Sequence, residues 1–87
     1  MISSEDPRSR LIAAKLRVTP QRIAVLEAVE KLKNHPTAEM IIAFVHRKNP
    51  SIAPGTVYKV LDNLVNAKLI SKVTAEKDIM RYDAVMD

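Results

Sequence analysis

The sequence predicts an α+β domain in which four helices are followed by a β-hairpin. All four helix starts are marked by a threonine cap or by a proline in the first turn. After residue 68 the spacing of apolar residues changes from a helical period to alternation, which is typical of strands. At 87 residues the chain is long enough for one small domain.

The first helix is expected over residues 7–16, with Pro7 near its start. Its inward side chains are predicted to be Leu11, Ile12 and Leu16. Residues 1–6 carry no such pattern, and we expect them to form a flexible N-terminus.

The second helix is expected over residues 20–33. Thr19 suits the N-cap, because its hydroxyl can accept a hydrogen bond from a free amide, and Pro20 suits the first helical position. The stripe predicted to face the core is Val25, Leu26, Val29 and Leu32. The charged side chains predicted to face solvent are Glu27, Glu30 and Lys31.

The segment Asn34–Thr37 should break the second helix, and Thr37 should cap a third over residues 38–48. Glu39 falls in the first turn, where the helix dipole favours negative charge. The side chains predicted to pack inward are Ile41, Ile42 and Val45. His46 matches no motif and is expected on the surface.

The fourth helix is expected over residues 54–67, opened by Pro54. Its core stripe follows the spacing i, i+3, i+4 and i+7: Val57, Val60, Leu61 and Leu64. Its other face shows Tyr58, Lys59, Asp62, Asn63 and Asn66. An exposed tyrosine beside a cation and amides favours base reading, and the free amides around Gly55 and Thr56 suit a phosphate.

Strands are expected over residues 69–74 and 79–85, joined by a polar turn at 75–78. Tyr82 is predicted to be a half-buried strand residue, and Met40 and Met80 to pack in the core or at its edge. Three helices closed by a hairpin describe a winged helix-turn-helix, here with one extra N-terminal helix. This domain is expected to cover residues 7–85.

Composition favours an anionic partner and excludes several kinds of site. The chain carries 14 basic and 10 acidic residues, a net charge of +4. It has no cysteine, which excludes disulfides and thiol chemistry, and one glycine, which excludes phosphate loops and G-x-S-x-G elbows. Its longest apolar runs are far short of the roughly 20 residues of a spanning helix, so we expect a cytoplasmic protein that is not membrane-bound. We do not expect an enzyme, because the sequence shows no paired-carboxylate signature, no cysteine and no serine elbow.

Four short motifs resemble the N-terminal DNA-binding domain of the ferric uptake regulator family. They are Arg17-Val18-Thr19-Pro20-Gln21-Arg22, His35-Pro36-Thr37-Ala38-Glu39, Thr56-Val57-Tyr58-Lys59 and Arg81-Tyr82-Asp83. Their order and gaps also fit the family, and the resemblance covers roughly residues 8–85. The family comprises metal-dependent, homodimeric bacterial transcription regulators, mostly repressors.

The resemblance implies roles for individual residues. Tyr58 matches a residue that meets bases in the major groove of DNA, and Arg17 matches one that enters the minor groove. Gln21 and Arg22 match positions near phosphates. His35 and Asp83 match two ligands of a regulatory divalent metal, for which iron, manganese and zinc remain alternatives.

The sequence also departs from the family. Ala53 stands where a capping serine is common, and Lys59 stands where arginine is usual, which gives up bidentate guanine recognition. Lys68 stands where glycine is common, which disfavours a left-handed backbone there. The His-Pro-Thr-Ala run and Asp83, in place of glutamate, look more like the peroxide-sensing branch.

The family's dimerisation domain and cysteine zinc site are absent from these 87 residues. We therefore expect this chain to be a monomer or weak dimer that binds no metal tightly, whereas the full-length form would be a metal-binding homodimer. The partner expected is a double-stranded DNA operator of metal-uptake or peroxide-stress genes. The alternative is a winged-helix module that binds protein, which would need an exposed apolar patch on helix 54–67 or on the wing.

Overall fold

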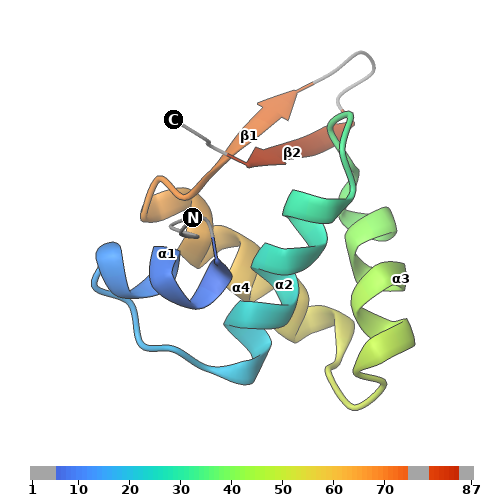
Figure 1. Cartoon of the computed structure of the whole chain (residues 1–87). Coiled ribbons are helices and arrows are strands. Elements are labelled where there is room, and N and C mark those ends of the chain that lie inside the picture. The colour runs from blue at the N-terminus through green and yellow to red at the C-terminus, as the bar shows by residue number, and fades with distance from the viewer. Residues whose placement is uncertain (1–5, 75–78, 85–87) are drawn as a thin grey trace.

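A computed structural model describes residues 6–74 and 79–84 of the chain (Figure 1). The elements are α1 (Pro7–Ala13), α2 (Pro20–Lys31), α3 (Ala38–Lys48), α4 (Pro54–Asn66), β1 (Ile70–Thr74) and β2 (Met80–Ala84). Four helices followed by a two-stranded antiparallel hairpin confirm the winged helix-turn-helix prediction. The segments predicted as a flexible N-terminus and a polar turn lie largely outside the described residues.

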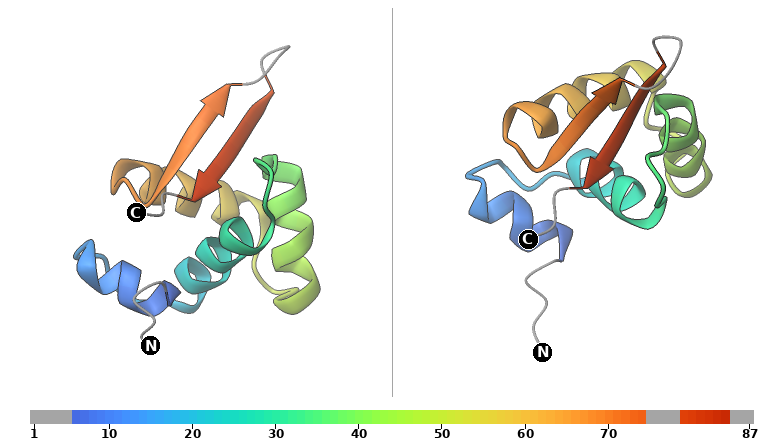
Figure 2. Two further views of the ribbon diagram at one scale, coloured as in Figure 1. Left: turned by 45° about the horizontal axis from the view of Figure 1, so that its top comes forward. Right: turned by 90° about the horizontal axis from the view of Figure 1, so that it is seen from above.

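Helix α2 lies at the centre of the domain and contacts α1, α3, α4 and β2. Figures 1 and 2 show α1 and α3 on opposite sides of it, with the hairpin standing above α2 and α4. None of the helices in the described part of the chain has the length and apolarity needed to span a membrane.

The predicted helix starts are confirmed. The Thr19 Oγ1 accepts a hydrogen bond from the amide of Arg22 at 3.1 Å, and the Thr37 Oγ1 accepts one from Met40 at 3.2 Å. Ala53 gives α4 no side-chain cap, and this helix begins instead with Pro54 at its first position. Each start therefore follows from one or two local residues.

Two helices end in the same way, with a lysine in the left-handed conformation. Lys15 (φ 64°) follows α1 and Lys68 (φ 65°) follows α4. The amides of Leu16 and Leu69 bond back to the carbonyls of Leu11 and Leu64, both at 3.0 Å, which is the Schellman pattern. The left-handed backbone at Lys68 corrects the expectation drawn from the missing glycine, and the turn at Lys15 ends the first helix before residue 16.

The second helix also ends earlier than predicted, at Lys31. Leu32 leaves the helical conformation, and Asn34 (φ 71°) and His35 (φ 58°) are both left-handed. This turn brings Pro36 against β2, where the Tyr82 amide donates a 2.9 Å hydrogen bond to the Pro36 carbonyl. The tertiary bond accounts for an ending that the local sequence did not predict.

The apolar stripes of α2, α3 and α4 form one core with Leu11 of α1 and Ile70 of β1. Within it Leu26, Ile41, Leu61 and Leu64 are fully buried. The prediction for Ile12 was wrong: this residue is 61% exposed, because it follows the fully buried Leu11 in α1 and is rotated by about 100° from it around the helix axis.

Glu30 was also predicted wrongly as a solvent-facing residue. Its carboxylate Oε2 lies 3.2 Å from Arg10 Nε, and the two side chains are only 15% and 12% exposed. Arg10 Nη2 further donates to the carbonyl of Leu69 at 3.4 Å. This pair joins α1 to α2 and to the start of the hairpin, a contact between distant segments that sequence periodicity cannot show.

In the hairpin, Ile70 pairs with Ala84 and Thr74 with Met80. Tyr82 is 4% exposed, so it belongs to the core and is more buried than predicted. Met40 and Met80 are 46% and 40% exposed and do not fill the core. Because side chains alternate along a strand, burying Tyr82 leaves Arg81 and Asp83 on the opposite face of β2.

The turn after α4 predicts an unusual stabilising substitution. A left-handed non-glycine residue costs about 1–2 kcal/mol, whereas the added chain entropy of glycine costs about 0.5–1 kcal/mol. We therefore expect Lys68→Gly to raise the free energy of unfolding by up to about 1 kcal/mol, as measured by urea denaturation. The matched variant Lys59→Gly, in the middle of α4, should lower it by about 1 kcal/mol. Losses in both variants would contradict this reading of the turn.

Candidate nucleic-acid interface

Helix α4 presents one buried and one exposed side, as predicted. Val57, Val60, Leu61 and Leu64 are at most 7% exposed. On the other side Lys59 and Gly55 are exposed, and Tyr58 is 45% exposed. A β-carbon added at Gly55 would meet open space, so the backbone at the start of α4 is accessible.

Five of the predicted DNA-contacting residues line one hollow between the start of α2 and the adjoining edge of α4. They are Arg17, Gln21, Arg22, Thr56 and Asn63, joined by Thr19 and Val60. The spacing of Thr56, Val60 and Asn63 puts them on one edge of the helix. The fold therefore gathers two motifs, one before α2 and one in α4, into a single polar groove.

Arg22 connects the two walls of this groove. Its Nη1 donates to the Arg17 carbonyl at 3.0 Å, and its Nη2 lies 3.5 Å from Asn63 Oδ1. The guanidinium is thus held between the segment before α2 and the exposed edge of α4. In this position it adds positive charge to the groove and also fixes the backbone that carries Arg17.

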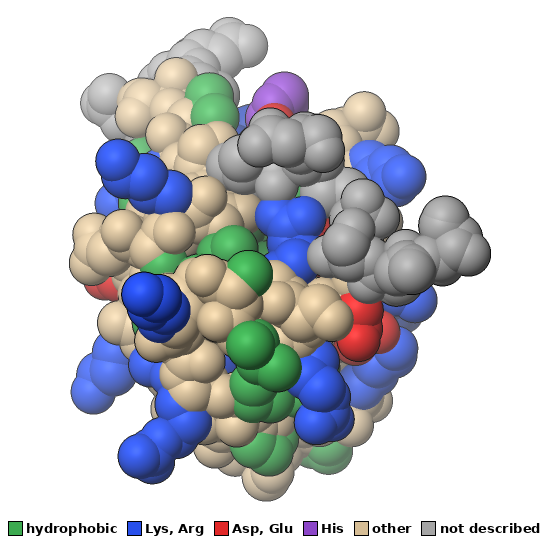
Figure 3. Space-filling model, turned by 60° about the vertical axis from the view of Figure 1, so that its left-hand side comes forward, with side chains coloured by type: hydrophobic (Ala, Val, Ile, Leu, Met, Phe, Trp, Pro, Cys, Tyr) green, Lys and Arg blue, Asp and Glu red, His purple; other side chains and the backbone are tan. Residues whose placement is uncertain are grey.

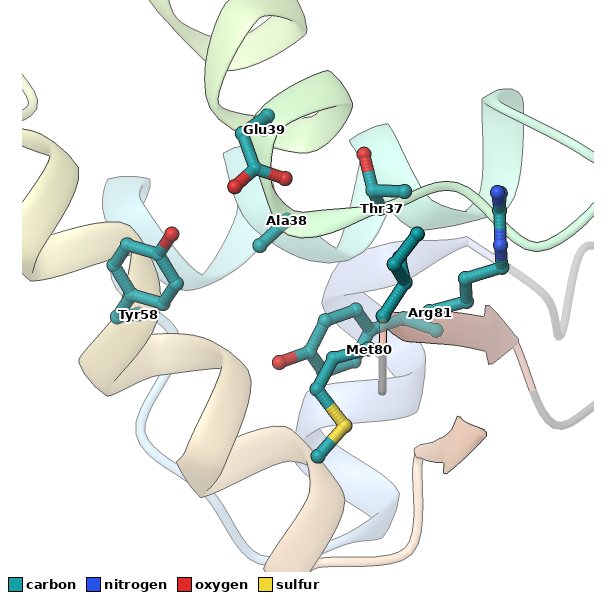
Figure 4. A pocket seen from close by; sticks show the side chains of 8 residues that line it. Thr37, Ala38, Glu39, Tyr58, Met80 and Arg81 are labelled. Carbon is teal, nitrogen blue, oxygen red and sulfur yellow. The ribbon is translucent and has the colours of Figure 1, made fainter. Parts of the chain in front are cut away.

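A second hollow lies between the start of α3, α4 and β2. It is lined by Thr37, Ala38, Glu39, Tyr58, Ile79, Met80, Arg81 and Tyr82. Figure 4 shows the Tyr58 hydroxyl and the Glu39 carboxylate facing one another across this hollow, with Met80 to one side. Helix α4 therefore borders both hollows: Thr56 and Asn63 line the basic groove, and Tyr58 lines the hollow with the acidic edge.

Basic side chains also cover a wider surface. Figure 3 shows the side of the molecule that carries α1 and the segment after it, and lysines and arginines are spread over most of this side. Acidic side chains on it are few. An excess of positive charge on one side favours contact with a polyanion.

The fold also brings together the two predicted metal ligands. The Nε2 atom of His35 lies 3.6 Å from Oδ2 of Asp83, and both side chains are about half exposed, at 51% and 52%. His35 belongs to the turn before α3 and Asp83 to β2, so their proximity depends on the tertiary fold. Among residues 6–74 and 79–84, no group of three His, Cys, Asp or Glu side chains is placed to hold a metal ion.

The chemistry of the pair fits two positions of a divalent metal site. Imidazole nitrogen and carboxylate oxygen suit iron, manganese and zinc. Two ligands with bonds of about 2.1 Å at a tetrahedral angle are roughly 3.4 Å apart, close to the separation seen here. Metal sites in proteins use at least three protein ligands, so these two side chains alone do not make up a complete site.

Sequence reasoning missed several residues that border these hollows. Thr19 was assigned only a capping role, yet it lines the basic groove. Glu39 was assigned to the helix dipole, and Arg81 appeared only in a family motif, yet both line the hollow beside Tyr58. The predicted helix-turn-helix could have indicated the position of Glu39, because helices of this motif pack with the start of the third helix beside the fourth.

Comparison with known proteins places this fold in a family. The model of the ferric uptake regulator family matches residues 13–87. The chain belongs to this family. Its fold is that of the family's N-terminal winged-helix DNA-binding domain. The family consists of transcription regulators, which supports a role other than catalysis.

Curated relatives are regulators of iron and peroxide responses. The chain is 37% identical over 84 residues to the transcriptional regulator FurA of Mycobacterium bovis, covering 97% of this chain and 56% of that protein. It is 31% identical over 77 residues to the ferric uptake regulation protein of Bacillus subtilis, with coverages of 87% and 52%. It is 34% identical over 70 residues to the peroxide operon regulator of the same organism, with coverages of 80% and 48%. The chain thus spans about half the length of these relatives.

Solved structures share the fold. The ferric uptake regulator of Vibrio cholerae superposes with a TM-score of 0.84 at 24% identity, covering 94% of this chain and 63% of that chain. A manganese uptake regulator gives a TM-score of 0.88 at 20% identity, with coverages of 100% and 63%. At these identities the likeness establishes the fold.

Tyr82, which lines the hollow beside Tyr58, should make the stability of the fold depend on pH. Burial raises the pKa of the Tyr82 phenol above its ordinary 10.0, and electrostatic repulsion from the nearby acidic groups Asp62, Tyr58 and Glu39 adds to this increase. As pH rises, the unfolded chain releases this proton first. The stability contributed by Tyr82 is therefore complete below about pH 10 and is lost as the pH rises through the raised folded-state pKa.

We expect Tyr82→Phe to remove the part of the loss of stability at alkaline pH that Tyr82 causes. Its free energy of unfolding should fall less than that of the parent between about pH 8 and pH 11, as measured by urea denaturation. Equal declines in the two proteins would show that Tyr82 does not titrate differently in the folded and unfolded states.

Proposed function

We propose that this chain binds duplex DNA sequence-specifically, as the DNA-reading domain of a metal-dependent bacterial transcription regulator that acts as a repressor in the cytoplasm. The observation that carries this proposal is the convergence of Arg17, Gln21, Arg22, Thr56 and Asn63 on one groove beside the exposed side of α4. Helix α4 would lie in the major groove, as second helices of helix-turn-helix motifs do.

The two hollows that border α4 support different tasks. The groove with Arg17 and Arg22 is basic and suits the phosphate backbone, which attracts lysine and arginine on any sequence. The opposite hollow has the Glu39 carboxylate at its edge, which repels phosphate. Tyr58 and Lys59 lie on the outward side of α4 and would meet base edges.

The metal would act as the regulatory signal. His35 and Asp83 would each donate one atom to a divalent ion, with the remaining ligands supplied by residues of a longer chain. The ion supplies a charge and a fixed geometry that link the DNA-binding domain to a dimerisation domain. Iron, manganese and zinc all fit the two donors, and relatives named for iron and for peroxide responses support control of metal-uptake or peroxide-stress genes.

The proposed oligomeric state follows from the separation between this DNA-binding domain and a dimerisation domain. In the full-length protein two such domains would form a homodimer and read two half-sites of an operator. The 87-residue chain alone would be monomeric or weakly dimeric, with lower affinity than a linked pair, because each domain binds one half-site.

One observation favours the alternative of a protein-binding module. Tyr58, Ile79 and Met80 are 45%, 42% and 40% exposed and border the same hollow, so this surface carries exposed apolar side chains of the kind that the alternative needs. A protein partner docked there would cover Tyr58 but would leave the groove with Arg17 and Arg22 unused. Variants in the two hollows therefore distinguish the two functions.

The first prediction of the proposed DNA-binding function concerns Tyr58. Tyr58→Ala should weaken binding to a specific operator by about 1–3 kcal/mol, the size of one good base contact, as measured by fluorescence anisotropy. The fold should remain intact, since the side chain lies outside the core. Operator affinity equal to that of the parent, or unfolding of the variant, would contradict the base-reading role.

The matched control is Leu61→Ala on the buried side of the same helix. Removing this fully buried side chain should lower the free energy of unfolding by about 2–5 kcal/mol through a cavity. At temperatures where the variant remains folded, its operator affinity should stay close to that of the parent.

A second prediction separates the two arginines of the groove. Arg17→Ala should reduce affinity most for sites with A·T-rich flanks, where a narrow minor groove concentrates negative potential. Arg22→Ala should weaken binding on all sequences and lower the salt slope by about one unit. Titrations on two duplexes that differ only in their flanks measure both effects, and equal, sequence-independent losses would exclude the minor-groove role of Arg17.

A further inference from the structure

We propose that Arg81 is a positioning residue that holds His35 in the orientation needed to share an ion with Asp83. This inference rests on the proposed metal-dependent function and assigns a role to a residue outside the predicted donor pair. Arg81 and Asp83 are two positions apart on β2, so both side chains leave the strand on the side opposite the buried Tyr82. The strand β2 therefore places both a guanidinium and a carboxylate beside His35.

The contacts between β2 and the turn before α3 are continuous. The Nη1 atom of Arg81 donates to the His35 carbonyl at 3.0 Å. The next backbone bond runs from the Tyr82 amide to the Pro36 carbonyl at 2.9 Å, and Thr37 forms an antiparallel bridge with Arg81. The backbone of β2 thus pairs with Pro36 and Thr37, and the side chain of Arg81 adds a hydrogen bond to the preceding residue, His35.

The backbone at this point needs such a constraint. Asn34 and His35 are consecutive non-glycine residues with φ of 71° and 58°. Left-handed conformations of this kind persist only where surrounding structure determines them. Arg81 bonds to the carbonyl of the second of these residues, and its guanidinium gives that bond a fixed direction.

The imidazole itself has little else to fix it. The His35 side chain is 51% exposed, and its Nε2 lies 3.6 Å from Asp83 Oδ2. Because packing restrains a half-exposed side chain weakly, its direction depends on the backbone from which it projects. Loss of the Arg81 bond should let the turn relax and spread the two donor atoms over a wider range of separations.

The test uses the 87-residue chain with Mn²⁺ as the only added metal. Paramagnetic broadening of the His35 imidazole and Asp83 amide NMR signals reports weak binding at this pair, and thermal unfolding is measured on the same samples. We expect Arg81→Ala to weaken Mn²⁺ binding roughly tenfold, the size typical of losing a residue that orients a metal ligand. Arg81→Lys, which can still donate one hydrogen bond to the carbonyl, should restore part of the affinity.

Two controls separate the possible failures. Lys72→Ala, on the neighbouring strand β1, removes a wing cation without touching the turn and should leave Mn²⁺ affinity unchanged. His35→Ala should abolish the localised broadening at Asp83. If the parent chain shows no localised broadening at the pair, the proposed metal site fails, whatever the role of Arg81.

If the parent binds and folded Arg81→Ala binds within about twofold of it, the positioning role is overturned. The role is also overturned if affinity and unfolding midpoint fall in proportion across the alanine and lysine variants, because a merely structural residue would act in that way. Should Arg81→Ala fail to fold, Arg81→Lys decides: reduced affinity at an unchanged midpoint supports the proposal, and unchanged affinity contradicts it.

Discussion

Burial of one side of α4 is the constraint on which the rest of the structure depends. Leu61 and Leu64 are fully buried, and Val57 and Val60 nearly so. Because a helix is rigid over these turns, burying that stripe fixes the direction of every other side chain on it. Tyr58 and Lys59 point outward for this reason, and Thr56 and Asn63 fall on the edge that meets the start of α2. The reading surface is therefore a consequence of core packing and needs no separate device to orient it.

A second constraint connects the wing to the helices. The turn that ends α2 carries two left-handed residues, and β2 holds it through bonds from Arg81 and Tyr82 to consecutive carbonyls. The same strand buries Tyr82 in the core and places Asp83 beside His35. In the proposed regulator, an ion at this pair would thus act on a segment already anchored to both the wing and the start of α3. The Arg10–Glu30 pair anchors the other end of the hairpin to α1 and α2.

The sequence predicts best those features that one or two neighbouring residues determine. Thr19, Thr37 and Pro54 start their helices as expected, and the stripe of α4 is buried at every predicted position. It predicts less well where distant segments meet. Glu30 is shielded by Arg10, and Lys68 is left-handed where the Leu69 amide bonds back to the Leu64 carbonyl. Ile12 points outward because the core takes up its neighbour Leu11, about 100° away around α1. For the candidate site, helix periodicity separates reading residues from core residues. It cannot show that His35 lies beside Asp83, which only the family resemblance implied.

The central claim is that duplex DNA binds along the groove of Arg17 and Arg22 and the exposed side of α4. Its most direct test is an NMR titration of the ¹⁵N-labelled chain with duplex DNA at low salt. The account predicts that amide shifts concentrate at residues 17–22 and 55–63, and that they weaken as salt is raised. The exposed side of α3, around Ala43 and Arg47, should change little. Shifts concentrated on α3 or α1, or no shifts with any duplex at low salt, would contradict it.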